Sequence, residues 1–392
     1  VKMSSILPIG VVHISTYIPR KCGIATFTKD LTTGINHLNP APKAAIIALD
    51  DPELEPVTYP AEVVKTIVQS DKHSYGEAAA FINNSPNINV VSIQHEFGIF
   101  GGESGDFVVP FVAAISKPLV ITLHTVLLYP SQKQLEIIKT LVERAQAIVV
   151  MLNKSKEVLI EVYDAPKEKI TVISHGVPDF PRLDTTHWKK KLGLLKHTVM
   201  ASINLISESK GLEYAIESLP QIIVRYPDFL YLIIGQTHPG YLRSQRGHDT
   251  YREKLTALVN KLHLSRHVRF VNKYLRLEEV VEYIGASDFY ITPYLDPQQA
   301  ASGSLAYALG AGKVCIATPY LYAKEMLSHG RGFLVPFRSS RAISNTLVNL
   351  FKHPDTRSKI ESAAYEIGKT MSWVNVGHQY FHLFQYVKHH SV

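Results

Sequence analysis

Cysteine is scarce in this sequence. Only Cys22 and Cys315 occur among 392 residues, and they lie far apart. Their spacing argues against a disulfide framework and against a structural zinc site. Long apolar runs are missing as well, because even the stretch 118–129 is interrupted by a histidine and two threonines. No segment therefore has the uninterrupted apolar length of a membrane-spanning helix, and we find no short repeats or low-complexity tracts.

What remains is the composition of a globular chain, with 46% hydrophobic residues, 19% charged residues and a mean hydropathy of +0.02. A length of 392 residues exceeds the usual size of one domain and predicts two domains of similar size. The net charge of +7 favours an anionic substrate, a phosphate-bearing ligand or an acidic membrane surface. Aromatic residues do not alternate with basic ones as in single-strand binders, so we expect no nucleic-acid partner.

The N-terminal apolar run shows no signal-peptide cleavage site and continues into a credible first strand. We therefore expect a cytoplasmic protein. The densest basic run, 188–196 (WKKKLGLLK), could lie on a membrane surface, although we favour a solvated helix face in a linker between domains. Peripheral membrane contact stays open, as does the oligomeric state.

Strand-like and helix-like segments alternate along the chain, as in parallel sheets with crossover helices. The first series of predicted strands is 11–15, 44–49, 63–67, 90–93, 119–123, 147–151 and 170–173; the second is 199–203, 229–234, 268–271, 289–292, 314–317 and 332–335. A polar, lysine-rich segment follows Pro178, so we predict domains at 1–178 and 179–373, with a last helix, 374–392, that crosses back onto the first domain. The predicted fold class is α/β, with two Rossmann-like, doubly wound domains whose ligands lie at the carboxyl ends of the strands.

The stretch 296–320 (DPQQAASGSLAYALGAGKVCIATPY) lies between two predicted strands and is rich in small residues. Ser302 and Ser304 stand where a helix would start, and Gly303 lets a ligand approach the backbone. The first-turn N–H groups could therefore bind an anion or sugar hydroxyls. Lys210 precedes Gly211 at another strand-to-helix turn and is a natural cation for a phosphate, since a lysine there opposes the helix dipole unless a ligand compensates it.

In the first domain, His124 follows the predicted strand 119–123, which places it at a carboxyl strand end. Glu96 follows the strand 90–93 in the sequence QHEFGIFGG, where Gly101 and Gly102 make the loop adaptable.

The loop after the first strand contains Arg20, Lys21 and Gly23, whose backbone N–H groups could hold a phosphate. Asp50 and Asp51 resemble a metal-binding pair. They lie in a proline-rich loop without matching ligands elsewhere, and we expect no metal.

The order of these motifs resembles glycosyltransferase family 4, whose GT-B architecture has two Rossmann-like domains facing a central crevice. The resemblance covers almost the whole chain. It rests on Pro19, Cys22 and Gly23; His124 in ITLHT; His175-Gly176-Val177; Lys210-Gly211; Gly235 at the end of LIIG; the stretch 296–320; and Glu325 followed by GRGFLVP. It implies a retaining hexosyltransferase that uses an activated, usually nucleotide-linked sugar and a carbohydrate or glycoconjugate acceptor, without a cofactor or a required metal.

The resemblance also implies roles for individual residues. The catalytic set is His124, as a hydrogen-bond partner of the sugar, Lys210, as the cation for the leaving phosphate, and Gln299. The donor-binding set is Gly23, Asn204, Lys210, Gly235, Ser302, Gly303, Ser304 and Tyr307. The acceptor-side set is Arg20, Glu96, Gly101 and Gly102.

Three positions depart from the family pattern. Leu205 stands where a second cation, an arginine, is expected, and Arg243, Arg246 or Arg252 are candidate substitutes. Gln299 and Tyr307 stand where two glutamates are expected, which face the transferred sugar and the ribose; Gln299 can hydrogen-bond sugar hydroxyls but carries no charge.

These departures keep alternatives open. The turn Ser302-Gly303-Ser304 also resembles the Ser-Gly-Thr turn that grips the sugar in glycogen phosphorylase, so a glycan phosphorylase that uses phosphate or sugar 1-phosphate is one alternative. A hydrolysing nucleotide-sugar epimerase shares the architecture, but its motif order fits less well. A non-catalytic carbohydrate-binding protein is another alternative, from a different functional class.

Overall fold

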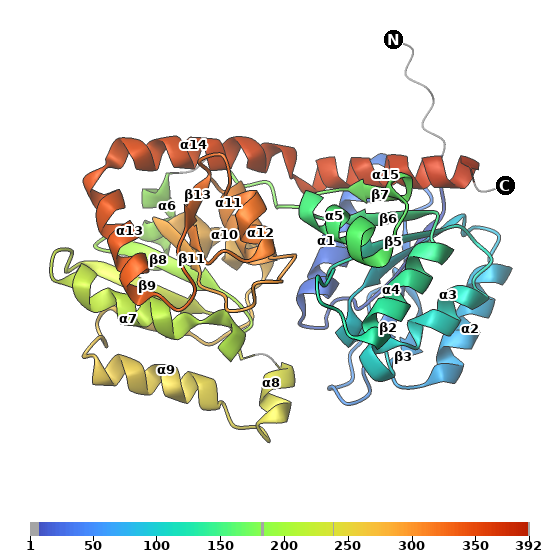
Figure 1. Ribbon diagram of the computed structural model, residues 1–392, viewed down its shortest axis with the longest axis horizontal. Helices are drawn as coiled ribbons and strands as arrows, with labels where there is room; N and C mark the ends of the chain where they lie inside the picture. Colours follow the sequence, from blue (N-terminus) through green and yellow to red (C-terminus); the bar gives the residue numbers. More distant parts are fainter. Residues whose placement is uncertain (1–7, 182–183, 238, 391–392) are drawn as a thin grey trace, which may run out of the picture. The chain divides into compact units, whose positions relative to one another are not determined.

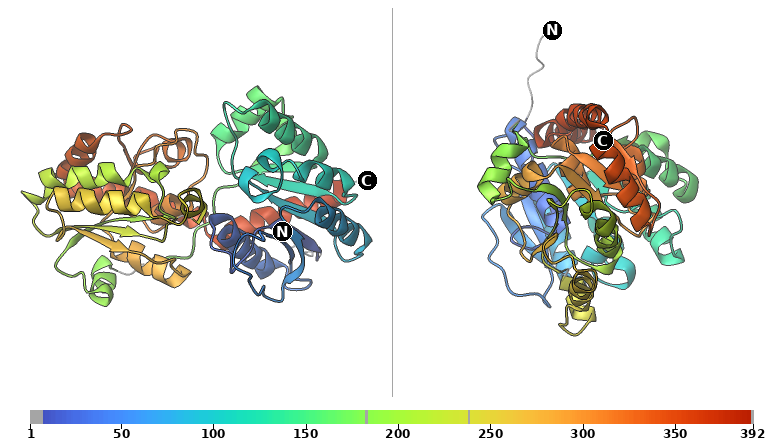
Figure 2. Two further views of the ribbon diagram at one scale, coloured as in Figure 1. Left: turned by 90° about the horizontal axis from the view of Figure 1, so that it is seen from below. Right: turned by 90° about the vertical axis from the view of Figure 1, so that its left-hand side faces the viewer.

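The computed structural model describes residues 8–181, 184–237 and 239–390. It divides into two compact units: Val1–Gly176 with Ser372–Val392 form unit 1, and Val177–Met371 form unit 2. Each unit contains one parallel sheet (Figure 1), and helices cover both faces of each sheet (Figure 2). The predicted α/β class with two doubly wound sheets is confirmed.

The sheet of unit 1 has seven strands in the order β3-β2-β1-β4-β5-β6-β7. The strands are β1 (Val11–Ser15), β2 (Ala45–Asp50), β3 (Val63–Val68), β4 (Val90–His95), β5 (Leu119–Leu123), β6 (Ala147–Val150) and β7 (Ile170–Val172). The helices are α1 (Gly23–Leu38), α2 (Lys72–Asn84), α3 (Val108–Ala114), α4 (Gln132–Arg144), α5 (Asn153–Tyr163) and α15 (Trp373–His390). Because helices cover both faces, β1 and β5 are buried throughout, which explains their nearly continuous apolar sequences.

The sheet of unit 2 has six strands in the order β10-β9-β8-β11-β12-β13. The strands are β8 (Thr198–Ile203), β9 (Phe229–Ile234), β10 (Val268–Val271), β11 (Phe289–Thr292), β12 (Val314–Ala317) and β13 (Gly332–Leu334). The helices are α6 (Thr185–Leu192), α7 (Leu212–Ile223), α8 (Pro239–Ser244), α9 (Thr250–Lys261), α10 (Leu277–Ala286), α11 (Gly303–Gly310), α12 (Leu321–Met326), α13 (Ser340–Lys352) and α14 (Pro354–Thr370). In both units the strand order reverses direction next to the first strand, between β1 and β4 and between β8 and β11, and ligands of such sheets bind at these points.

Helix α15 is the last element of the chain and packs on α1 within unit 1. Gly377 of α15 faces Gly34 of α1 so closely that a Cβ on Gly377 would lie 2.3 Å from the carbonyl carbon of Gly34. The two helices therefore meet backbone to backbone, which only glycine permits. At the start of α15, the Trp373 ring lies 5.1 Å from the Phe27 ring and 5.6 Å from the His175 ring, centroid to centroid.

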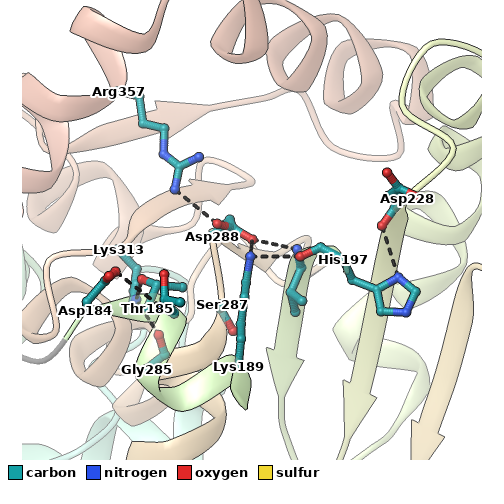
Figure 3. A network of polar contacts seen from close by, with 12 residues as sticks. Asp184, Thr185, Lys189, His197, Asp228, Gly285, Ser287, Asp288, Lys313 and Arg357 are labelled. Atoms are coloured by element: carbon teal, nitrogen blue, oxygen red, sulfur yellow. Dashed lines mark hydrogen bonds and ion pairs between the residues drawn. The ribbon is translucent and has the colours of Figure 1, made fainter. Parts of the chain in front are cut away.

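The segment predicted as a solvated linker is helix α6, which packs on α10 in unit 2. Its Lys189 Nζ lies 2.6 Å from Asp288 Oδ2, and both side chains are largely buried (13% and 11% exposed). Asp288 also accepts a hydrogen bond from the Val199 N–H at 2.7 Å and pairs with Arg357 of α14 at 3.3 Å, as Figure 3 shows. Helix α6 therefore belongs to unit 2 and is not a linker, because one buried carboxylate ties α6, β8 and α14 together. The predicted solvated helix face is confirmed, since Lys190 and Lys191 are exposed.

Lys313 makes a second contact between α6 and the sheet. Its Nζ donates to Thr185 Oγ1 at 3.1 Å and to the Gly285 carbonyl at 2.8 Å (Figure 3). Burial lowers the pKa of Lys313 to about 8. In the described part of the chain, no helix is long and apolar enough to cross a membrane.

Candidate active site

In unit 2, the predicted donor-binding residues follow three neighbouring strands. Gly235 follows β9, Asn204 and Lys210 follow β8, and the turn 302–304 follows β11. Because the carboxyl ends of parallel strands meet at one edge of the sheet, these residues share that edge.

The turn that carries Lys210 is held by backbone contacts. Gly211 has φ +58°, and a Cβ at this position would lie 2.2 Å from the Pro293 carbonyl oxygen, so only glycine fits. The Leu295 N–H donates to the Ser209 carbonyl at 2.9 Å. These contacts bring the turn after β8 against the loop after β11, where the sugar-binding stretch was predicted.

Lys210 lies against an aromatic ring in this arrangement. Its half-buried ammonium lies 4.2 Å from the centroid of the Tyr294 ring, within the range of a cation–π contact. Burial lowers the pKa of Lys210 to about 8, and the nearby carboxylate of Asp296 opposes this shift. A partly desolvated cation interacts more strongly with an anion than one in water does.

Tyr294 joins the predicted residues to one another, although the sequence analysis did not single it out. Its hydroxyl donates to Asn204 Oδ1 at 2.5 Å and hydrogen-bonds Ser304 Oγ at 2.9 Å. Thr318 Oγ1 fixes the Tyr294 backbone by donating to its carbonyl at 2.5 Å. We call Asn204, Lys210, Tyr294 and Ser304 the carboxyl-edge cluster.

One polar atom of the cluster has no partner. Asn204 Nδ2 is buried and makes no hydrogen bond in the described part of the chain. Buried polar groups are nearly always paired, so this amide is available to a ligand.

The first turn of α11 presents backbone donors beside the cluster. Ser302 caps the helix: its Oγ accepts from the Leu305 N–H at 3.3 Å and its carbonyl accepts from the Ala306 N–H at 2.9 Å. The N–H groups of Gly303 and Ser304 have no partner among the described residues, as expected at a helix start. Both N–H groups can donate to an anion.

Gln299 and Tyr307, which replace the two expected glutamates, have different surroundings. Gln299 Nε2 donates to the Ala301 carbonyl at 2.9 Å, which fixes the amide and leaves Oε1 as an acceptor. Tyr307 is 8% exposed, and its ring lies 6.4 Å from the Phe180 ring in an edge-to-face contact.

In unit 1, the predicted residues follow the neighbouring strands β1, β4 and β5. His124 is buried against Phe27, with ring centroids 4.8 Å apart, and its Nε2 lies 2.9 Å from Gln94 Oε1. Burial lowers the pKa of His124 to about 3, with His175 and His95 adding to the shift. The ring is therefore neutral at pH 7; because an amide oxygen only accepts, Nε2 carries the proton and Nδ1 is an acceptor.

Glu96 lies next to this histidine at the end of β4. Thr125 Oγ1 donates to Glu96 Oε2 at 2.6 Å, and the Phe97 N–H donates to Oε1 at 2.9 Å. Burial raises the pKa of Glu96, and these two hydrogen bonds oppose the rise. Adjacent strands thus bring Glu96 and His124 together.

The remaining residues predicted for unit 1 differ in exposure. Gly23 is the exposed first residue of α1, and a Cβ at this position would have no atom within 4 Å. Arg20 makes a long contact of 3.5 Å to the Leu49 carbonyl. Gly101 is buried and donates its N–H to Tyr75 Oη at 3.0 Å, so it shapes the loop, whereas Gly102 is exposed with φ +86°.

Two observations concern sites elsewhere. Within the described residues, no group of three or more His, Cys, Asp or Glu side chains could hold a metal ion.

A pocket of about 270 Å³ is lined by Lys117, Pro118, Arg144 and Gln146, at the amino end of β5. It lies at the opposite edge of the sheet from His124 and is not part of the candidate site.

Comparisons with known proteins show which family this chain is similar to. The family described as "Glycosyl transferases group 1" matches residues 184–367. The D-inositol 3-phosphate glycosyltransferase of Corynebacterium glutamicum (strain R) is 26% identical over 251 residues, which cover 59% of this chain and 55% of that protein. The match thus spans about half the length of this curated relative.

Solved structures share the fold at low sequence identity. Anabaena HepE, crystallised with UDP and glucose, has a TM-score of 0.75 at 16% identity, with 96% of this chain and 99% of that chain covered. Sucrose-phosphate synthase from Thermosynechococcus elongatus has a TM-score of 0.77 at 16% identity, with coverage of 97% and 99%. Residues 184–367 are thus similar to the glycosyl transferases group 1 family, and the chain has the GT-B glycosyltransferase fold.

Proposed function

We propose that this protein is a retaining glycosyltransferase that moves a hexosyl group from a nucleotide sugar to a carbohydrate or glycoconjugate acceptor. The observation that carries the proposal is the carboxyl-edge cluster, which lies inside the family match at residues 184–367. It combines a cation, an unpaired amide and a helix N-terminus at the strand-order reversal, where ligands of such sheets bind.

The cluster fits the charge that develops when a glycosidic bond to phosphate breaks. The leaving phosphate gains negative charge, and Lys210 and the N–H groups of Gly303 and Ser304 are placed to stabilise it. Removing one such preorganised donor typically costs a factor of about 10² to 10³ in turnover. Lys210 is the strongest of the three because it carries a full charge in a partly desolvated position.

Residues of unit 1 supply sugar contacts in this proposal. His124 Nδ1 accepts a hydrogen bond from a sugar hydroxyl, and the neutral ring does not act as an acid at pH 7. Glu96 and the exposed Gly102 loop bind the acceptor. Gln299 offers its Oε1 to the transferred sugar without adding a charge.

A structural neighbour suggests the donor to test, and a relative supports glycosyl transfer. Anabaena HepE was crystallised with UDP and glucose, and the Corynebacterium relative is named a glycosyltransferase. We propose a UDP-sugar as the first donor to test, in a reaction that needs no metal or cofactor and takes place in the cytoplasm. An acidic membrane surface is compatible with the net charge of +7.

Calorimetric titration with UDP, GDP, ADP and inorganic phosphate tests the proposal. We expect one nucleoside diphosphate to bind with micromolar affinity, and we expect Lys210→Ala to lose donor turnover while keeping its melting temperature. Lys261→Ala, at an exposed position at the end of α9, is the matched control and should behave as wild type. If no nucleotide binds at millimolar concentration, the protein is not a nucleotide-sugar transferase.

The glycan phosphorylase remains a second candidate because Ser304 hydrogen-bonds Tyr294 beside Lys210, in a turn similar to the sugar-gripping turn of glycogen phosphorylase. Binding of inorganic phosphate without binding of any nucleotide would favour it. Binding of a glycan without turnover of any donor would favour a carbohydrate-binding protein.

A further inference from the structure

Arg252 lies in the first turn of α9 and binds the backbone at the end of β9. Its Nη2 donates to the Gly235 carbonyl at 3.0 Å and to Thr237 Oγ1 at 3.3 Å, and its Nε donates to Asp249 Oδ2 at 3.0 Å. These contacts hold the guanidinium at the carboxyl edge of the sheet of unit 2.

The third nitrogen of the guanidinium has no partner. Arg252 Nη1 is buried and makes no hydrogen bond in the described part of the chain. An unpaired donor on a buried cation is costly, and a fully structural arginine would have it satisfied. The other contacts of Arg252 thus hold Nη1 in place, while the N–H donors of Nη1 stay unused.

The segment that Arg252 binds runs beside Leu205, where an arginine is expected. The chain after β8 runs beside the chain after β9: the Asn204 N–H donates to the Ile234 carbonyl at 3.0 Å, and the Ile206 N–H donates to the Gln236 carbonyl at 2.9 Å. Leu205 lies between these two bonds. Neighbouring strands are about 4.8 Å apart, so the backbone of Gly235, which Arg252 binds, lies one strand away from that of Leu205.

A second contact brings α9 close to the Lys210 turn. Tyr251, the neighbour of Arg252, accepts a hydrogen bond from the Leu212 N–H at 3.0 Å and donates to the Glu213 carboxylate. Both partners lie in the first turn of α7, which follows Lys210-Gly211, and Figure 1 shows α9 beside α7.

We propose that Arg252 is the second cation for the donor's diphosphate and replaces the arginine missing at Leu205. The inference rests on the proposed function and specifies its donor site: Arg252 Nη1 and Lys210 Nζ bind the same diphosphate. The other two candidates, Arg243 and Arg246, are exposed, and we assign them no role.

The test compares Arg252→Gln with Arg246→Gln by calorimetric titration with UDP and with uridine, together with melting temperatures. Both variants remove one positive charge from unit 2. We expect Arg252→Gln to bind UDP about 10- to 100-fold more weakly, the range of a charge-assisted hydrogen bond, and to bind uridine within about twofold of wild type. Arg252→Lys should recover part of the UDP affinity, whereas Arg246→Gln should match wild type.

The outcomes separate this inference from the proposed function. Equal losses of UDP and uridine affinity, with a lower melting temperature, would mean that Arg252 only braces the loop. Unchanged UDP affinity would also overturn the inference. If wild-type protein binds UDP, GDP and ADP at no measurable level, the proposed function fails and the role of Arg252 fails with it.

Discussion

The pKa of Lys210 leads to a prediction about pH. Burial lowers this pKa to about 8, so the lysine loses its proton within an accessible pH range. Only the protonated amine attracts a diphosphate. At pH 7 about nine-tenths of free protein carries the charge, and at pH 9 about one-tenth does. The affinity for UDP should therefore be highest below pH 8 and should fall about tenfold by pH 9.

Titration calorimetry with UDP between pH 7 and pH 9.5, at constant ionic strength, measures this fall. The terminal phosphate of UDP ionises near pH 6, so the phosphate does not titrate in this window. Lys210→Arg keeps its charge at all these pH values, and its affinity should not fall. Lys210→Ala should bind about 10- to 100-fold more weakly than wild type at pH 7 and should show no pH dependence.

Two results would refute the reasoning. Wild-type affinity that stays level to pH 9.5 would mean that Lys210 does not bind the diphosphate or does not titrate near pH 8. The same fall in Lys210→Arg as in wild type would assign the titration to another group. Melting temperatures at each pH show whether unfolding contributes to the fall in UDP affinity.

Other substitutions test the framework around the site. Tyr294→Phe removes the hydroxyl that joins Asn204 to the α11 turn; we expect weaker UDP binding and a melting temperature roughly 2–8 °C lower, and unchanged values would argue against the cluster. Gly235→Ala places a Cβ 1.7 Å from the Asn204 carbonyl oxygen at φ +133°, so urea denaturation should show a loss of more than about 2 kcal/mol, and wild-type stability would contradict the backbone geometry. Asp288→Ala leaves the largely buried Lys189 without its anion and should cost about 3–5 kcal/mol in unfolding free energy; a loss below about 1 kcal/mol would contradict the network in Figure 3.

The strands were predicted well because their signal is local. The runs Val11–Ser15, Phe229–Ile234 and Val314–Ala317 are mostly apolar, are bounded by polar or turn residues, and are strands with the predicted ends. Strands that are covered on both faces must be apolar throughout, and this property is visible in any single sequence.

Helix α6 was predicted as a solvated helix face in a linker between domains and not as an element of unit 2. Helix α6 resembles a polar linker because its sequence, TTHWKKKL, has a low apolar content. One of its stabilising contacts is the ion pair with Asp288, which is 99 residues away from Lys189 in the sequence. A local sequence pattern contains no information about a partner so distant in the chain. In the sequence, a cluster of lysines therefore indicates a solvated surface even where one of them pairs with a buried aspartate.

The candidate site was predictable in position and less so in its contacts. Asn204, Lys210 and Ser304 follow neighbouring strands, and the strand-order rule brings them to one edge. Tyr294 was missed, since a tyrosine just after a strand has many roles and only the fold shows that its hydroxyl joins two of them. The acceptor-side role of Gly101 stays a prediction, and its N–H donates to Tyr75 Oη.

The structure of the protein with bound UDP tests the central claim most directly. We predict that the diphosphate lies within hydrogen-bonding distance of Lys210 Nζ and of the N–H groups of Gly303 and Ser304. Ordered UDP bound away from the carboxyl edge of the unit 2 sheet, with Lys210 still against the Tyr294 ring and free of phosphate, would contradict the account.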